Sequence, residues 1–345
     1  MRILDVVVIG AGQAGLSLGY YLKRNKKKFI LLDKHRNVGD SWKRRYDSLT
    51  LFTPRRYSSL PGLSLEGSQD GYPSKDEVAA YLKEYAKKFE IPIQLDTTVT
   101  LVSKEAENLY KVKTDNGEFI TRNIVVATGP FQEPFTPTFS KSFSDGVNQL
   151  HSDEYRNKSQ LVNGTTLIVG AGNSGYQIAT ELCDDFNIYL AEGNKNKNLP
   201  HKILNKSIFW WFDVLGLSKV TERHPVGKIL KKNDPVIGKE HKPYIKAGKI
   251  KMKKRLKSGS HNVAIFEDGD NLPVNNIIWA TGFVYSYPWL EVRGVIDSKG
   301  IPIQKRGVTK QKGFYFLGLP WMHTRGSALL TGVNKDAEYL STIMG

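Results

Sequence analysis

The sequence predicts an α/β fold of two Rossmann-like domains, each suited to a dinucleotide, with the second domain inserted in the first. A pattern of apolar strand, glycine turn, helix and second strand occurs twice, at residues 3–33 and 165–192. An apolar strand that ends in Ala-Thr-Gly also occurs twice, at residues 124–129 and 277–282. Two copies of both patterns favour two homologous nucleotide-binding units.

The length of the chain sets the domain boundaries that we expect. A chain of 345 residues is long enough for two domains of ordinary size. The segment after residue 282 is too short for a third domain, so the chain must return to the first one. We expect one domain of residues 1–160 and 281–345, and an inserted domain of residues 161–280.

The composition is that of a soluble globular protein, with 40% apolar and 24% charged residues. No stretch approaches the roughly 20 apolar residues that a membrane-spanning helix needs. The apolar N-terminal run stops at Gly10, too soon for a signal peptide, and is expected to be a strand. These features predict a cytoplasmic protein without a stable membrane anchor, and they leave the oligomeric state open, a homodimer included.

The charge pattern argues against a nucleic-acid partner. Lys and Arg outnumber Asp and Glu by 50 to 34, which gives a net charge of +16. The basic runs at residues 26–28 and 251–255 are not interleaved with aromatic residues, so we interpret them as solvated surface. The single Cys183 excludes a disulfide pair within the chain and is expected to be buried and inert. The seven histidines show no metal-ligand spacing, so no metal site is expected.

The first unit reads in order as a strand at residues 3–9, a helix at about 13–25 and a strand at 29–33. An irregular segment then runs to residue 71, and ordered loops of this length tend to be functional. Ser74 and Glu77 form a capping box that predicts the next helix. After an extended segment at 91–102, an Asn-Gly turn predicts a hairpin that leads into a third, apolar strand ending at Thr128 and Gly129.

The first glycine turn has the spacing G-x-G-x-x-G, with Gly10, Gly12 and Gly15. The first glycine permits the tight turn, the second lets a pyrophosphate approach the backbone, and the third lets the helix pack closely on the strand. Asp33 ends the following strand, where a carboxylate accepts hydrogen bonds from both ribose hydroxyls of an adenosine. We therefore expect an adenine dinucleotide here.

The second glycine turn repeats the spacing with Gly170, Gly172 and Gly175, and Glu192 ends the next strand. Two such sites in one chain suggest a permanent flavin and a diffusing nicotinamide, and their order favours FAD at the N-terminal site. Because a carboxylate repels a ribose 2′-phosphate, Glu192 predicts that NADH is used at least as well as NADPH. Lys195 and Lys197 lie close by and would offset part of that repulsion.

Further positions are expected to line the two cofactors. Near FAD they are Gln13, Ala14, Lys34, Ser41, Trp42, Val99, Thr128, Gly129, Gly318, Ser327 and Leu329. Near the nicotinamide dinucleotide they are Asn173, Ser174, Thr281 and Gly282. The segment Ala328–Val333 is expected to start a helix whose N–H groups point at the flavin.

Nearly the whole chain resembles the bacterial flavin-containing monooxygenases of class B, including the CzcO-like group. The resemblance rests on the stretches GAGQAG, SWKRRYDSLTLFTPRRYSSLPG, VVATGPFQEPFTP, QLHSDEYRN, VGAGNSGYQIATEL, IIWATGF and FYFLGLPWMHTRGSALL. The family signature F-x-G-x-x-x-H-x-x-x-[YFW] is met in part by Phe143, Gly146, His151 and Tyr155. The last two have the family spacing, whereas the first two intervals are each one residue too long.

The resemblance implies that NADH or NADPH reduces FAD, that O₂ adds at flavin C4a, and that the peroxyflavin transfers one oxygen atom to a small substrate. A sulfide is the favoured acceptor, with an amine or a ketone as alternatives. Three side chains are candidates for catalytic roles. Thr53 would contact the flavin, His151 would move a proton or pin the linker, and Arg325 would stabilise the reduced flavin or contact a carboxylate.

Two other functions remain open on these residues. One is an NAD(P)H-dependent reductase that passes electrons from the flavin to a protein acceptor, and the other is a flavin-binding redox regulator. The aromatic cluster Phe209–Phe212 is expected to be core, with a wall of the substrate entrance or a partner surface as the alternatives.

Overall fold

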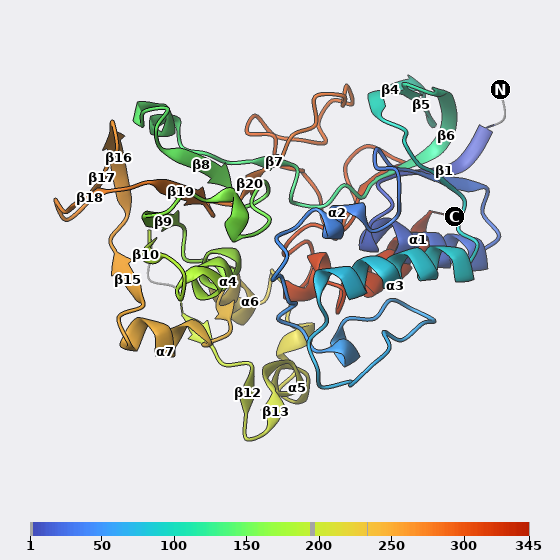
Figure 1. Ribbon diagram of the computed structural model, residues 1–345. Helices are drawn as coiled ribbons and strands as arrows, with labels where there is room; N and C mark the ends of the chain where they lie inside the picture. Colours follow the sequence, from blue (N-terminus) through green and yellow to red (C-terminus); the bar gives the residue numbers. More distant parts are fainter. Residues whose placement is uncertain (1–2, 194–196, 233, 345) are drawn as a thin grey trace.

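The computed structural model describes residues 3–193, 197–232 and 234–344. The N-terminal and C-terminal parts of the chain lie together on one side of the molecule, and the middle of the chain forms the other side (Figure 1). Within the described residues no helix is long and apolar enough to cross a membrane. The predicted α/β fold is confirmed, with one mixed sheet and one parallel sheet.

The first sheet has the strand order β3-β2-β1-β6-β5-β4, and β21 pairs with the C-terminal end of β6. The pairs β2–β3, β1–β2, β1–β6 and β6–β21 are parallel, whereas β4–β5 and β5–β6 are antiparallel. Its strands are β1 (Ile3–Ile9), β2 (Phe29–Leu32), β3 (Ile93–Gln94), β4 (Val99–Ala106), β5 (Leu109–Thr114), β6 (Gly117–Val126) and β21 (Phe314–Phe316).

The second sheet is parallel throughout and has the order β15-β10-β9-β19-β8. Its strands are β8 (Asn148–His151), β9 (Thr165–Val169), β10 (Asn187–Ala191), β15 (Ile250–Lys253) and β19 (Asn276–Trp279). The order repeats that of β3-β2-β1-β6-β21 in the first sheet. In each sheet the last of the five strands comes from outside the repeated unit: β21 follows the second unit, and β8 precedes it. The domain boundaries themselves stay a proposal.

Short strands complete the connections. β16, β17 and β18 form an antiparallel sheet, and the pairs β11–β14, β12–β13 and β7–β20 are two-stranded. Their bounds are β7 (Glu133–Pro134), β11 (Asn198–Leu199), β12 (Lys202–Ile203), β13 (Lys206–Ser207), β14 (Val236–Ile237), β16 (Leu256–Ser260), β17 (Val263–Phe266), β18 (Asn271–Pro273) and β20 (Phe283–Val284).

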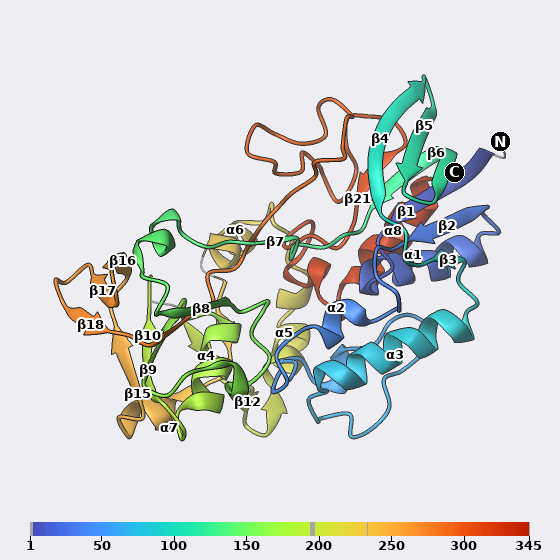
Figure 2. The same cartoon turned by 45° about the horizontal axis from the view of Figure 1, so that its top comes forward.

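The helices cover the sheets and fill the region between them (Figure 2). The α-helices are α1 (Gln13–Arg24), α2 (Asp40–Lys43), α3 (Lys75–Lys88), α4 (Asn173–Leu182), α5 (Ile208–Val214), α6 (Pro225–Lys232), α7 (His241–Lys246) and α8 (Val333–Ile343). The 3₁₀ turns are η1 (Arg55–Tyr57), η2 (Thr138–Ser142), η3 (Lys158–Gln160), η4 (Leu217–Lys219) and η5 (Arg325–Ala328). The predicted Ser74–Glu77 capping box is confirmed at the start of α3.

Two local predictions were wrong. The hairpin loop consists of Asp115 and Asn116, because Thr114 pairs with Gly117, and no separate third strand follows. β6 continues without a break to Val126, since β1 pairs along its apolar half. The last helix begins at Val333 and not at Ala328, because residues 325–328 form the 3₁₀ turn η5.

The two links between the sheets run side by side. β7 leaves the first Ala-Thr-Gly segment and pairs antiparallel with β20, which leaves the second one. The Arg45 guanidinium lies 4.8 Å from the Phe131 ring and 5.1 Å from the Phe283 ring, and its Nη1 donates to Asp153 over 3.0 Å. Burial lowers the pKa of Arg45. One cation therefore holds both links together.

Candidate functional site

The first glycine turn has the geometry that a pyrophosphate site needs. Gly10 adopts a φ of 107°, and a Cβ there would lie 2.7 Å from the Ala127 carbonyl oxygen. A Cβ on Gly15 would lie 1.9 Å from the Gly10 oxygen, so no larger residue fits. A Cβ on Gly12 would meet no atom within 4 Å. The backbone is thus open at the one position where an anion must approach.

Gln13 connects three segments at the start of α1. Its Oε1 accepts a hydrogen bond from Trp42 Nε1 over 3.2 Å, and its Nε2 donates to the Ala328 carbonyl over 3.2 Å. A Cβ on Gly318 would lie 2.7 Å from Ala14 Cβ. The glycine turn, the irregular loop with Trp42 and the C-terminal segment therefore meet, as the sequence predicts.

Asp33 lies at the end of β2 and faces the glycine turn. Its Oδ2 accepts from the Ala11 N–H over 2.7 Å, and its Oδ1 accepts from both the backbone N–H and the Nδ1 of His35. Burial by itself raises the pKa of Asp33, but the hydrogen bonds from His35 and Ala11 outweigh it and lower the pKa. The carboxylate stays ionised and suited to accept from ribose hydroxyls.

The second glycine turn repeats this geometry. A Cβ on Gly170 would lie 2.3 Å from the Ala280 oxygen, one on Gly175 would lie 1.8 Å from the Gly170 oxygen, and one on Gly172 would meet nothing within 4 Å. Asn173 Oδ1 is buried without a hydrogen-bond partner at the start of α4. An orphaned acceptor beside an open glycine fits a dinucleotide that brings its own donors.

Glu192 follows β10, as predicted for the acid that faces the second ribose. Arg255 lies beside the next residue, because a Cβ on Gly193 would lie 3.1 Å from the guanidinium carbon, and Arg255 Nε pairs with Glu267 over 3.2 Å. Of the two lysines expected near this acid, Lys197 is exposed and Lys195 lies outside the described residues. Sequence reasoning missed Arg255, because it arrives from residues far along the chain with no motif around it.

The other predicted cofactor residues lie on several elements. Thr128 and Gly129 follow β6, and Thr281 and Gly282 follow β19. Thr128 Oγ1 accepts from Gln132 Nε2, and the Thr281 hydroxyl donates to the Phe135 carbonyl. The remaining positions are distributed as follows: Val99 is buried in β4, Lys34 and Ser41 are exposed, Ser174 lies in the first turn of α4 near Tyr46, and Leu329 lines a cavity.

His151 is buried at the end of β8 and uses both ring nitrogens on the backbone. Its Nε2 donates to the Gly282 carbonyl over 3.0 Å, and its Nδ1 accepts from the Asp153 N–H over 3.0 Å. Burial lowers the pKa of His151. This neutral tautomer fixes the second Ala-Thr-Gly segment, which favours the linker-pinning alternative over proton transfer.

Phe143 and Gly146, the first two residues of the family signature, have different surroundings. Phe143 lies in contact with Gly259, where a Cβ would come within 2.2 Å of the ring. The ring also lies 6.4 Å from that of Trp279. The atom nearest to a Cβ on Gly146 would be Ser144 Oγ, 3.8 Å away. These contacts hold the β8 linker against the small sheet of β16–β18.

The other two catalytic candidates have internal partners. The Thr53 hydroxyl is buried 2.7 Å from Ser58 Oγ. Arg325 Nε donates to Asp234 Oδ1 over 2.7 Å, so this arginine contacts a carboxylate, one of the two alternatives expected for it. Trp321 Nε1 donates to the other oxygen of Asp234 over 2.8 Å. Ser327 Oγ accepts from the backbone of His323 and Thr324 and so caps η5.

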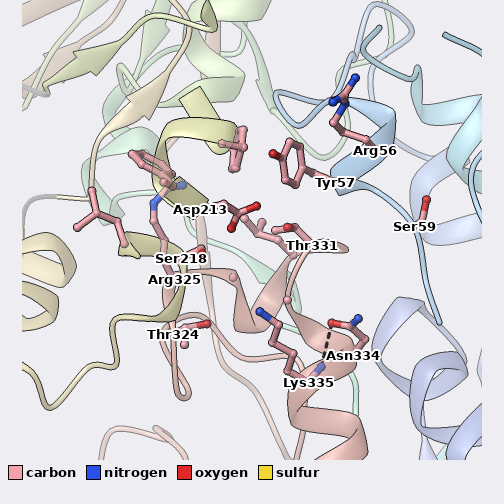
Figure 3. Close-up of a pocket in the computed structure, with 16 residues that line it drawn as sticks. Arg56, Tyr57, Ser59, Asp213, Ser218, Thr324, Arg325, Thr331, Asn334 and Lys335 are labelled. Carbon is pink, nitrogen blue, oxygen red and sulfur yellow. Dashed lines mark hydrogen bonds between the residues drawn. The ribbon is translucent and has the colours of Figure 1, made fainter. Parts of the chain in front are cut away.

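A cavity of about 220 Å³ lies where the C-terminal segment meets α5 (Figure 3). Its walls come from η1, from α5 and η4, and from η5 and the start of α8. The Tyr57 hydroxyl and the Asp213 carboxylate face one another across it. The lining residues are Arg56, Tyr57, Ser59, Phe209, Phe212, Asp213, Leu217, Ser218, Thr324, Arg325, Gly326, Leu329, Thr331, Gly332, Asn334 and Lys335.

Comparisons with known proteins identify the family. Residues 7–201 match the family described as pyridine nucleotide-disulphide oxidoreductase, and residues 185–306 match the family described as flavin-binding monooxygenase-like. A CzcO-like uncharacterized oxidoreductase of Geobacillus kaustophilus is 53% identical, with 98% of this chain and 97% of the relative covered. The CzcO oxidoreductase of Bacillus subtilis is 55% identical, with 97% of each chain covered.

A solved structure agrees with these relatives. The flavin-containing monooxygenase from Stenotrophomonas maltophilia superposes with a TM-score of 0.84 at 27% identity, with 100% of this chain and 98% of that chain covered. The match spans both sheets and the links between them. The chain therefore belongs to the CzcO-like oxidoreductases of the flavin-binding monooxygenase family, and it is an oxidoreductase that depends on a flavin and a pyridine nucleotide.

Proposed function

We propose that the protein is an FAD-dependent monooxygenase that uses NADH or NADPH and O₂ to oxygenate a small soft nucleophile. A sulfide is the favoured acceptor, with amines and ketones as further candidates. FAD is assigned to the glycine turn at Gly10–Gly15 and the nicotinamide dinucleotide to the turn at Gly170–Gly175. The open backbone at Gly12 and Gly172 supports a dinucleotide at each turn, and the order of the two units favours FAD at the first.

The observation that carries the proposal is the cavity beside the start of α8. Thr331 and Gly332 line it directly before the first residue of the helix. The dipole of a helix favours negative charge at its N-terminus, and a reduced flavin carries such charge at its pyrimidine edge. The walls come from the first and the inserted units, and a volume of about 220 Å³ suits a small substrate.

When bound, FAD supplies the two-electron and oxygen chemistry, which protein side chains lack. The residues of this chain bind and orient the cofactors and the substrate, and they exclude water. The Phe209 and Phe212 rings form an apolar wall of the cavity, and such a wall limits access of water to a reactive intermediate. Burial and the facing Asp213 carboxylate raise the pKa of Tyr57, so this hydroxyl keeps its proton at the cavity.

The test is a coupling measurement on the FAD-loaded protein. We expect one sulfoxide per NADPH or NADH consumed when methyl phenyl sulfide is supplied, with little hydrogen peroxide. Without the sulfide, consumption of NADPH or NADH should be slower or should produce hydrogen peroxide. If consumption is unaffected by sulfide but rises strongly with a ferredoxin or another one-electron acceptor, the protein is a reductase and this proposal is wrong.

A further inference from the structure

The β12–β13 hairpin and α5 form a protruding lip at one edge of the molecule. Figure 1 shows the hairpin extending beyond the rest of the fold, with α5 beside it. Trp211 Nε1 donates to the Ile203 carbonyl over 3.0 Å, which ties the helix to the hairpin. We call this surface the lip, defined by the side chains of Ile203, Leu204, Trp210, Trp211, Val214 and Leu215.

The tip of the hairpin carries an apolar residue where turn chemistry disfavours one. Leu204 and Asn205 form the two-residue loop, with φ values of 49° and 58°. Asn and Gly adopt such φ values readily, whereas a leucine does so at a cost. Leu204 is also 83% exposed, so packing within the chain does not offset that cost. A residue that disfavours its own backbone conformation and gains no packing within the chain points to a function.

The helix α5 has two distinct faces. Phe209 and Phe212 point inward and line the cavity. The opposite face carries Trp211, Val214 and Leu215 at the helical spacing i, i+3 and i+4. Val214 is 58% and Leu215 64% exposed. The apolar outer face of α5 adjoins the apolar hairpin tip, so the two form one patch. A patch larger than single scattered residues marks an interaction site.

Positive charge surrounds the lip. Lys202 and Lys206 flank the hairpin tip, and Lys219 follows α5; all three are exposed. The Lys206 ammonium lies 5.8 Å from the Trp210 ring. Apolar and tryptophan side chains ringed by lysines match a membrane interface, where the tip enters the acyl region and lysines reach anionic headgroups. Asp213, the acidic residue of α5, faces the cavity.

We propose that the lip docks reversibly on an anionic lipid surface. The docking is peripheral, because the lip consists of one hairpin and one two-turn helix. Docking would place the cavity next to the lipid, because the inner face of α5 lines the cavity. Apolar substrates that partition into the membrane would then enter along α5. The inference does not depend on the reaction that the cavity carries out.

The test uses the FAD-loaded protein and sedimentation with vesicles of two compositions. One is an equal mixture of phosphatidylcholine and phosphatidylglycerol, and the other is phosphatidylcholine alone. We expect binding to the mixed vesicles, much weaker binding to the neutral ones, and loss of binding as salt is raised. The reversal of two charges in the variant with Lys202→Glu and Lys206→Glu should abolish the preference for anionic vesicles.

A matched pair of variants isolates the hairpin tip. Leu204→Asn suits the turn and should fold at least as well as the parent, yet lower binding by roughly ten-fold, which is about 1.4 kcal/mol. Ile301→Asn removes a 46% exposed apolar side chain in the segment between β20 and β21 and should leave binding unchanged. NADPH consumption without vesicles should be the same in both variants, so failure here is distinguishable from failure of the proposed function.

Three results would overturn the proposal. The first is no binding to either kind of vesicle. The second is equal loss of binding in Leu204→Asn and Ile301→Asn. The third is a dimer in size-exclusion chromatography that Leu204→Asn dissociates, because the lip would then be an interface between two copies of the chain.

Discussion

At the scale of the residue, small details of position decide what each group can do. Gly10, Gly12 and Gly15 look equivalent in sequence, but the first and third are fixed by contacts within the fold and the second faces open space. Glu192 predicts that NADH is used at least as well as NADPH, but the Arg255 guanidinium lies beside the next residue, Gly193. A guanidinium can pair with a ribose 2′-phosphate and offset the carboxylate.

Arg255→Ala should therefore raise KM for NADPH roughly ten-fold, as expected for the loss of one charge-assisted contact, and change KM for NADH little. Steady-state kinetics with both nucleotides check this, with kcat read separately. Lys104→Ala serves as the control, because Lys104 is an exposed lysine in β4 of the other sheet. Equal effects of Arg255→Ala on both nucleotides would show that Arg255 does not face the 2′ position.

Gly15→Ala should lower the free energy of unfolding by about 2–4 kcal/mol, because its Cβ would overlap the Gly10 carbonyl oxygen. Urea denaturation of the cofactor-free protein measures the change. Gly146→Ala, whose Cβ would meet only Ser144 Oγ at 3.8 Å, should stay within about 0.5 kcal/mol of the parent. A tolerant Gly15 would mean that α1 and β1 are not packed as described.

At the scale of the element, local patterns were the best guide. The apolar runs and the first glycine turn predict β1, α1 and β2 nearly to the residue, and the capping box predicts the start of α3, because each signal is local and strong. The wrong predictions concern the bounds of elements that depend on more than their own local pattern. β6 continues through the expected break because β1 pairs along it, and the start of α8 is delayed by the 3₁₀ turn at Arg325.

The element α7 offers a prediction on pH. Burial holds the pKa of His241 at about 4, below its ordinary value of 6.5, and its ring stacks on Tyr176 at 3.6 Å. The unfolded chain then gains a proton that the folded chain refuses. Stability should therefore fall as the pH drops from about 6.5 toward 4.

The variant His241→Gln tests this prediction, since glutamine can still accept the hydrogen bond from Asn198. Urea denaturation of both proteins at neutral pH and near pH 5 should show a smaller pH dependence for the variant. An unchanged dependence would assign the acid sensitivity to other groups.

At the scale of the whole molecule, the repeat predicts two homologous units, and the two sheets share a strand order. The contacts between the two units could not be predicted. Asp234 holds Trp321 and Arg325 from the C-terminal segment, and Arg45 bridges Phe131 and Phe283. Residues this far apart in sequence carry no shared motif, so the single sequence gives no signal for such pairs. The cofactor and catalytic assignments stay predictions.

Asp234→Ala should loosen the segment that contains Trp321 and Arg325, because both side chains lose a hydrogen-bonded carboxylate. Hydrogen exchange should rise several-fold in residues 320–327 and stay unchanged in α1. Because Asp234 is 40% exposed, the melting temperature should move little. Uniformly faster exchange across the chain would indicate general destabilisation instead.

The central claim is that one glycine turn holds the flavin and the other holds the hydride donor. Gly12→Val and Gly172→Val separate the two roles, since a Cβ at either position meets no atom of the fold. The most direct measurement is the visible spectrum of each purified variant before and after anaerobic NADPH. The account predicts a colourless, folded Gly12→Val protein and a yellow Gly172→Val protein that NADPH fails to bleach. A yellow Gly12→Val protein that NADPH bleaches as in the parent would contradict it.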